Sequence, residues 1–264
     1  MKWPERLTLI RHDTSAFNAL REKKNASRLY QNFRKSFEKN LESEECRSLA
    51  YEVMDAFILK AGDHDTPLAE KAGWQAKKVG EELRKLIKLP DVIFVSPYVR
   101  TKITLEKLIE GWPELREVQV KEEERIREQD HGLALIYNDW RVFEAIHPDQ
   151  RILRNMQGGY WYRFPQGENV PDVRGRLHEW LGALIRDYSE KNVMAVTHHL
   201  TILSLRANLE RLDAKEFERL DHEEKPINAG VTIYRGEPDQ GGNGRLVLEA
   251  YNLNLYSDRN FQTS

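Results

Sequence analysis

Cysteine is almost absent from this sequence, with Cys46 as the only one in 264 residues. A lone cysteine excludes an internal disulfide framework and a cysteine-based metal cluster, and it is typical of a reducing compartment. The first six residues contain no apolar core of a signal peptide, so we expect no such peptide. These absences favour a cytoplasmic protein.

Long apolar runs and an excess of charge of one sign are also missing. No stretch approaches the roughly 18 apolar residues of a membrane-spanning helix, so we expect no membrane insertion. The net charge is only −2 although 32% of the residues are charged, so no overall field favours nucleic acid or a membrane surface. Any anionic ligand must therefore be bound by a few local cations.

Short apolar runs without polar alternation are typical of strands buried on both faces. Three such runs occupy residues 7–10, 91–95 and 193–196, and two later strands are expected at 230–234 and 246–251. Helical spacing of apolar residues predicts helices at 69–87, 98–110, 172–189 and 200–209. The pattern predicts an α/β fold, a three-layer sandwich with a mostly parallel sheet and helices on both faces.

Residues 19–62 differ in composition from this framework, being dense in Lys, Arg, Glu and Asn. Apolar spacing predicts one amphipathic helix near residues 29–41 and another over Leu49–Lys60, with Gly62 ending it. The segment is too short for a core of its own and should lean on the main body. We predict a single domain, 1–264, with a helical insertion at about 19–62 that caps the site and controls substrate choice.

Cations and histidines follow the three buried runs, as Arg11-His12, Ser96-Pro97-x-x-Arg100 and Thr197-His198-His199. Ser96 and Pro97 have the pattern of an N-cap followed by proline at the first helical position. One strand can end in charged residues without forming a site, but three parallel strands bring their ends together where ligands bind in open α/β sheets. Arginine forks bind tetrahedral oxyanions, whereas imidazole can act as nucleophile, acid, base or metal ligand. Two arginines disfavour a metal ion, so a phosphate clamp with a nucleophilic histidine fits better.

Six motifs in the expected order resemble those of the histidine phosphatase (phosphoglycerate mutase-like) superfamily. They are Arg11-His12-Asp13-Thr14-Ser15-x-x-Asn18, Asp65-Thr66-Pro67-Leu68 with Gly73-Trp74-Gln75-Ala76, Ser96-Pro97-Tyr98-Val99-Arg100-Thr101, Arg127-Glu128-Gln129-Asp130-His131-Gly132, Phe164-Pro165-Gln166-Gly167-Glu168 and Val196-Thr197-His198. Together they cover most of the chain.

The resemblance implies a phosphoglycerate mutase-like fold and hydrolysis of phosphate monoesters through phosphohistidine, without a metal or another cofactor. It implies that His12 attacks phosphorus, and that Glu128 protonates the leaving oxygen and then activates water. The implied phosphate-holding residues are Arg11, Arg100 and His198. The implied further contacts to phosphate or substrate are Ser15 and Asn18. His199 lies where the family has a small residue, and we expect it to be a supporting group or a substrate contact rather than the catalytic histidine.

This chain departs from the family pattern at Asp13, which replaces the usual glycine, and at Thr101 and His199, which replace small residues. A carboxylate at position 13 would repel phosphate unless it points away or pairs with a cation, and it could raise the pKa of a neighbouring histidine. The identity of the acid also has alternatives, because Glu128 lies in the highly charged run Lys121–Asp130, where most carboxylates are simply solvated. The alternatives are that Glu124 is the acid instead, or that no residue of this run is.

Two other functions stay open at this point. A phosphoglycerate-type mutase would need a phosphoenzyme shielded from water and extra cations, and Asp13 argues against it. A catalytically silent relative could bind a phosphorylated partner, but the presence of His12 and both arginines argues against that function. The expected partner is a small phosphorylated substrate, with no nucleic acid and no membrane, and a homo-oligomer is compatible with the sequence.

Overall fold

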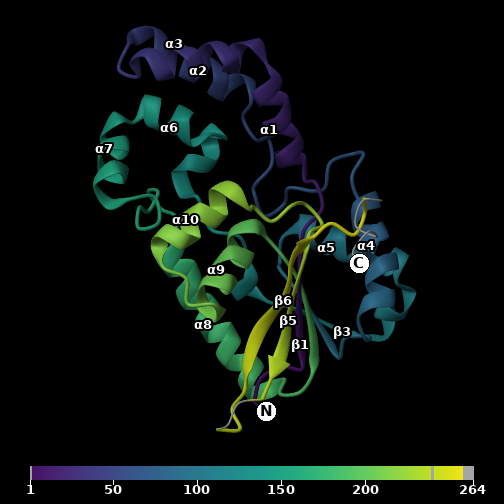
Figure 1. Cartoon of the computed structure of the whole chain (residues 1–264). Helices are drawn as coiled ribbons and strands as arrows, with labels where there is room; N and C mark the ends of the chain where they lie inside the picture. Colours follow the sequence, from purple (N-terminus) through teal and green to yellow (C-terminus); the bar gives the residue numbers. More distant parts are fainter. Residues whose placement is uncertain (1, 239–240, 258–264) are drawn as a thin grey trace.

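The structure is a computed structural model that describes residues 2–238 and 241–257. A six-stranded sheet with the order β3-β2-β4-β1-β5-β6 forms its centre (Figure 1). The strands are β1 (Arg6–Arg11), β2 (Val92–Val95), β3 (Gln119–Glu122), β4 (Asn192–Thr197), β5 (Val231–Glu237) and β6 (Arg245–Leu253). Strands β1 to β4 pair in parallel, whereas β5 is antiparallel to β1 and β6. The prediction of a mostly parallel sheet is confirmed.

Helices cover both faces of the sheet, as the sequence predicts. The covering helices are α4 (Trp74–Leu86), α5 (Val99–Gly111), α8 (Val170–Asp187) and α9 (His199–Leu209). Leu7 and Leu9 of β1 pack with residues of α8 and α9, while Ile10 packs on the other face with residues of α4 and α5. Because both faces are buried, the side chains of the central strands are mostly aliphatic, with Thr8 and Thr197 as buried polar exceptions.

Some predicted helix boundaries are wrong for local reasons. Ser96 does not cap a helix, because its hydroxyl lies 2.8 Å from Nε2 of His198 and α5 begins only at Val99. The helix predicted from residue 69 begins at Trp74, after Gly73 with its φ of 99°. The structure also contains α10 (Ala214–Glu223), which the sequence analysis missed, and the 3-10 turns η1 (Pro113–Glu117) and η2 (Glu124–Ile126). Within the described ranges, no helix is both long and apolar enough to cross a bilayer.

Two segments far apart in the sequence form a cap beyond the carboxyl ends of β1, β2 and β4 (Figure 1). The cap consists of α1 (Ala16–Ala26), α2 (Arg28–Asn40), α3 (Glu44–Ala56), η3 (Gly132–Tyr137), α6 (Trp140–Ile146) and α7 (Pro148–Gln157). Phe33 and Val53 of the first segment share one apolar core with Val142 and Phe143 of the second. The predicted insertion thus packs mainly against another part of the cap. Its last helix ends at Ala56, so Gly62 does not cap it.

Candidate active site

His12 follows β1 directly, and its side chain is positioned as a nucleophile. The residue is 4% exposed, and its backbone N–H donates to the carbonyl oxygen of Thr197 at 2.9 Å. Nδ1 of the ring lies 2.7 Å from the carbonyl oxygen of Asp13. Because a carbonyl oxygen only accepts, Nδ1 carries the proton in this contact. The lone pair on Nε2 is then available to attack an electrophile.

His198 lies beside His12, with 5.3 Å between the ring centroids. Its Nε2 is 2.8 Å from the hydroxyl oxygen of Ser96, and the whole residue is buried. Nδ1 of His198 is buried with no hydrogen-bond partner among the described residues. If Ser96 donates to Nε2, Nδ1 carries a proton that it can donate to a ligand. Beside His12, this unpaired donor is suited to bind an oxygen of a ligand.

Arg11 and Arg100 bring two guanidinium groups to these histidines. Burial, followed by the charges of Arg100 and Arg11, holds the pKa of His12 well below its ordinary value. Burial lowers the pKa of Arg11 to about 10, so its guanidinium stays charged at neutral pH. The structure therefore brings together Arg11, His12, Arg100 and His198, as the strand-end pattern predicts.

Arg100 is paired with Asp63, a residue that the sequence analysis did not single out for the site. Nη1 of Arg100 donates to the carbonyl oxygen of Asp63 at 2.6 Å and to Oδ1 of its carboxylate at 2.9 Å. Nη2 lies 3.4 Å from Oδ2. A guanidinium has five N–H donors, so Nε–H and one hydrogen on Nη2 remain for a ligand.

The Asp13 carboxylate does not face the histidines and arginines of the site. The repulsion of phosphate that its place beside His12 suggested is therefore not expected. The carboxylate accepts from the backbone N–H of Thr14 at 2.6 Å, and from those of Gly73 and Ala76 at 3.0 Å each. Gly73 and Ala76 lie at the start of α4, where a carboxylate satisfies free N–H groups and complements the helix dipole. Asp13 therefore caps α4. The pKa of His12 is lowered by burial and the two arginines, and only the hydrogen bond to the Asp13 carbonyl oxygen opposes that shift.

Ser15 and Asn18 form a capping box at the start of α1. The Ser15 hydroxyl donates to Oδ1 of Asn18 at 2.9 Å. Oδ1 of Asn18 also accepts from Nδ2 of Asn228 at 3.2 Å, and Asn228 donates to the carbonyl oxygen of His12 at 3.1 Å. With Oδ1 occupied, the amide hydrogens of Asn18 are the part of this group that can bind an anion. Ser15 acts here on the orientation of Asn18.

Glu128 is half-buried in the loop after η2, whereas the alternative acid Glu124 is exposed. Oε1 of Glu128 accepts from the backbone N–H of Gln129 at 3.0 Å. The Glu128 charge partly opposes the effect of burial on the pKa of Arg11, so this carboxylate lies near the Arg11 guanidinium. Of the two candidates, Glu128 has the better position to act as the acid.

His199 faces α10, which the sequence analysis missed. Its Nε2 lies 2.8 Å from Oδ1 of Asp221. Burial lowers the pKa of His199, although the Asp221 carboxylate opposes that effect. The structure therefore shows His199 held by Asp221, and a direct contact between His199 and substrate stays a prediction.

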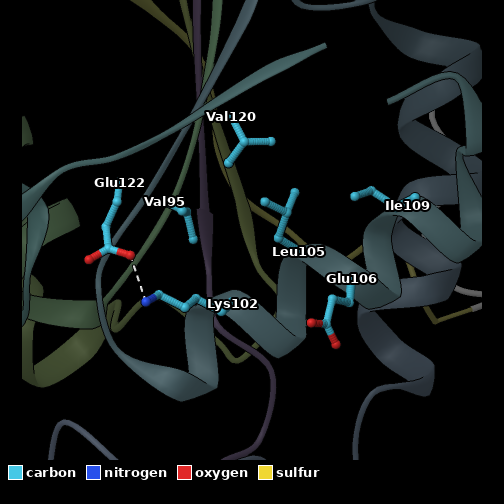
Figure 2. A pocket seen from close by; sticks show the side chains of 7 residues that line it. All are labelled: Val95, Lys102, Leu105, Glu106, Ile109, Val120 and Glu122. Atoms are coloured by element: carbon cyan, nitrogen blue, oxygen red, sulfur yellow. Dashed lines mark ion pairs between the residues drawn. The ribbon is translucent and has the colours of Figure 1, made fainter. Parts of the chain in front are cut away.

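No metal site accompanies this cluster in the described part of the chain, where no group of three or more His, Cys, Asp or Glu side chains could hold an ion. A separate hollow lies beside the edge strand β3, where Lys102 and Glu122 pair at 2.6 Å (Figure 2). None of the residues that line this hollow is a predicted site residue. We therefore place the candidate active site at the strand ends.

Comparison with known proteins agrees with this geometry. Residues 58–247 match the model of the histidine phosphatase superfamily (branch 1). Phosphoglycerate mutase-like protein AT74H of Arabidopsis thaliana is 33% identical over 180 residues, which are 61% of this chain and 62% of the relative. Phosphoserine phosphatase 1 of Hydrogenobacter thermophilus is 28% identical over 58% of this chain and 69% of its own length. The chain spans about three fifths of the two Arabidopsis relatives, at 62% and 60% of their lengths.

Solved structures share the fold over nearly the whole chain. Mycobacterial glucosyl-3-phosphoglycerate phosphatase in complex with inorganic phosphate superposes with a TM-score of 0.63 at 21% identity, covering 95% of this chain and 98% of the other. Phosphoserine phosphatase from Entamoeba histolytica gives 0.61 at 18% identity, covering 94% and 96%. At these identities the likeness shows the common fold.

Proposed function

Because the chain belongs to the histidine phosphatase superfamily (branch 1), we propose that it hydrolyses small phosphate monoesters through phosphohistidine at His12. The observation that carries the proposal is the contact between Nδ1 of His12 and the carbonyl oxygen of Asp13, which leaves Nε2 free to attack. The guanidinium groups of Arg11 and Arg100 supply donors suited to phosphoryl oxygens. The buried, unpaired Nδ1 of His198 supplies another.

In the first chemical step, Nε2 of His12 attacks phosphorus, and a P–N bond forms while the ester P–O bond breaks. Arg11, Arg100 and His198 stabilise the charge on the non-bridging oxygens of the transferred group. Glu128, in its protonated form, gives a proton to the leaving oxygen. The hydrogen bond from Nδ1 to Asp13 stabilises the positive charge that develops on the imidazole.

In the second step, water attacks the phosphohistidine from the side that the alcohol has left. Glu128, now ionised, takes a proton from this water, and the P–N bond breaks to release phosphate and His12. One carboxylate can serve both steps because the leaving oxygen and the attacking water occupy the same position opposite Nε2. The cycle needs no other acid or base.

A phosphoglycerate-type mutase is the second candidate, since two relatives are named phosphoglycerate mutase-like proteins. A mutase transfers the phosphoryl group to a second hydroxyl, whereas a phosphatase transfers it to water. Release of inorganic phosphate, measured against formation of a phosphorylated isomer, separates the two.

The single cysteine, Cys46, supports the further proposal that the protein works in the cytoplasm.

Hydrolysis of phosphorylated metabolites is expected to continue in EDTA, because two guanidinium groups already supply the positive charge that a metal ion supplies elsewhere. A panel of phosphate monoesters should be assayed with and without EDTA, by release of inorganic phosphate. Equal rates are expected. Loss of activity in EDTA with recovery on adding Mg²⁺ or Zn²⁺ would contradict the mechanism, and no turnover of any ester would favour the silent relative.

The pH dependence of kcat/KM should reflect the low pKa of His12. A free histidine gains a proton near pH 6.5 and would lose its nucleophilic lone pair. Because burial and the two arginines lower the pKa of His12, its neutral form persists below that value. Because a phosphate monoester itself gains a proton at about pH 6, kcat/KM is measured for aryl and alkyl esters whose phosphate pKa values differ, between pH 4 and 8 as an approximate working range. We expect any acid limb to move with the pKa of the ester, whereas a limb fixed near pH 6.5 for every ester would show that the nucleophile titrates normally.

A further inference from the structure

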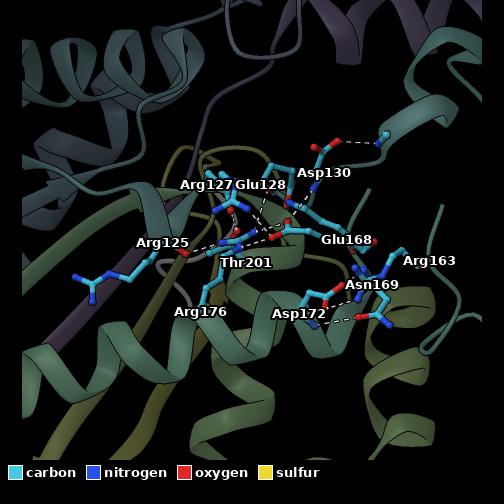
Figure 3. A network of polar contacts seen from close by, with 12 residues as sticks. Arg125, Arg127, Glu128, Asp130, Arg163, Glu168, Asn169, Asp172, Arg176 and Thr201 are labelled. Carbon is cyan, nitrogen blue, oxygen red and sulfur yellow. Dashed lines mark hydrogen bonds and ion pairs between the residues drawn. The ribbon is translucent and has the colours of Figure 1, made fainter. Parts of the chain in front are cut away.

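The acid loop, residues 125–128, is held by a side chain from α8. Nη1 of Arg176 donates to the carbonyl oxygen of Arg125 at 2.5 Å, and Nη2 donates to that of Glu128 at 3.1 Å. One guanidinium thus binds the two ends of the loop, and Figure 3 shows it reaching from α8 toward Glu128. Its side chain is 10% exposed, so water competes little for these carbonyl groups.

Hydroxyl groups from β4 and α9 hold the two residues between these ends. The Thr197 hydroxyl donates to the carbonyl oxygen of Ile126 at 2.6 Å, and the Thr201 hydroxyl donates to that of Arg127 at 2.7 Å. Four consecutive carbonyl groups, from η2 into the loop that follows it, therefore accept hydrogen bonds from side chains. Such a loop keeps one conformation without the ladder of a strand or helix.

Glu168 in turn fixes Arg176. Its carboxylate accepts from Nε of Arg176 at 2.9 Å and from Nη2 at 3.1 Å, a bidentate pair. The same carboxylate accepts from Arg127 at 2.6 Å and from the backbone N–H of Asp130 at 3.1 Å (Figure 3). The side chains of Arg176 and Glu168 are only 10% and 14% exposed. Together they contact residues before Glu128, at Arg125 and Arg127, and after it, at Asp130.

We propose that Arg176, oriented by Glu168, is a positioning residue that holds the Glu128 carboxylate at the leaving oxygen of the substrate. The inference rests on the proposed function, because it assigns a purpose to Arg176 only if Glu128 is the acid. A displacement of about 1 Å can lower a rate about a hundredfold even when the displacing change is far from the chemistry. The Arg176 charge also contributes to the lowered pKa of His198, so the substitution that tests its positioning role must keep that charge.

Arg176→Lys is the discriminating substitution. Lysine keeps the positive charge but is a point donor, which cannot reproduce a planar fork that binds two carbonyls and a carboxylate. The matched control is Arg163→Lys, because Arg163 pairs with Asp172 at 2.7 Å near the same network, is 55% exposed and does not contact the acid loop. Thr201→Val is a second, nearly isosteric variant that removes one loop contact and keeps the packing.

The measurement is kcat/KM across a series of phosphate esters, from nitrophenyl to alkyl leaving groups. This parameter reports the first step, in which a good leaving group needs no proton and a poor one does. For Glu128→Gln we expect a loss of about 10² to 10⁴-fold on alkyl phosphates, but little change on nitrophenyl phosphate. For Arg176→Lys we expect a loss of about 10 to 100-fold with the same leaving-group dependence. Thr201→Val should give a smaller loss of the same kind, and Arg163→Lys none.

Equal losses on all leaving groups for both Arg176→Lys and Thr201→Val would overturn the inference, since they would indicate general damage to the fold. So would an unchanged profile for these two variants. The proposed function fails separately, and visibly, if Glu128→Gln itself shows no dependence on the leaving group. The affinity of Arg176→Lys, Thr201→Val and Arg163→Lys for inorganic phosphate should stay within about threefold of the parent, because none of these three residues is among those proposed to hold the phosphate.

Discussion

His12→Ala is expected to lower turnover of every phosphate monoester by at least about 10⁴-fold, since removal of a nucleophile leaves only the residual catalysis of binding and charge. The arginines, His198 and Glu128 stay in place in this variant, so it should still bind inorganic phosphate. The comparison of kcat with phosphate affinity therefore separates loss of chemistry from loss of the site. Steady-state kinetics and a binding titration provide both values.

The matched control is His178→Ala, because His178 is exposed on α8 and takes no part in the strand-end cluster. It should retain the activity of the parent. Comparable turnover by His12→Ala and the parent would remove His12 from the mechanism, whatever the activity of the control.

Lys24→Met is expected to lower the free energy of unfolding by about 3 to 5 kcal/mol, the usual result of breaking a buried ion pair from one side. Lys24 is fully buried in the cap and pairs with Oδ2 of Asp139, which is 5% exposed. Tyr30 also donates to this oxygen, at 2.6 Å. Without the lysine, the charge of Asp139 stays buried without its cation. Denaturant unfolding monitored by circular dichroism measures the change.

Lys23→Met serves as the control, because Lys23 is adjacent on α1 but exposed. It should change the unfolding free energy by no more than about 0.5 kcal/mol. The double variant Lys24→Met with Asp139→Asn should recover part of the loss, since neither charge remains and asparagine can still cap α6. A loss below about 1 kcal/mol for Lys24→Met would show that the pair does not join the two segments of the cap.

The strand ends could be predicted because each is continuous in the sequence. A run of aliphatic and β-branched residues leads directly into Arg11 and His12, and another leads into His198, so each run predicts both a strand and the polar residues at its end. Arg100 lies in the first turn of α5, the helix that follows β2. These are the residues that the structure brings together.

The partners of these residues could not be predicted, because they come from distant segments. Asp63 lies 37 residues from Arg100, and Arg176 lies 48 residues from Glu128. No pattern in the sequence around these residues indicates either contact. Asp13 shows the opposite difficulty, since its place beside His12 suggested an effect on the phosphate, whereas its side chain turns toward the start of α4.

The composite nature of the cap was also beyond the sequence analysis. The apolar spacing of α2 and α3 predicts two amphipathic helices, but it does not tell which surface buries their apolar faces. In the structure, Phe33 and Val53 are covered by residues of α6. The proposed control of substrate choice therefore involves both segments of the cap, and removal of one would expose the core of the other.

Chemical trapping of the phosphoenzyme tests the central proposal most directly. The protein should be mixed with a ³²P-labelled phosphate monoester, quenched in alkali and digested, and the labelled peptide identified. We expect label that survives base, is lost in acid and maps to His12, as a phosphoramidate requires, and no label in His12→Ala. Label that is stable in acid, or that maps to another residue, or equal labelling of His12→Ala, would contradict the phosphohistidine mechanism.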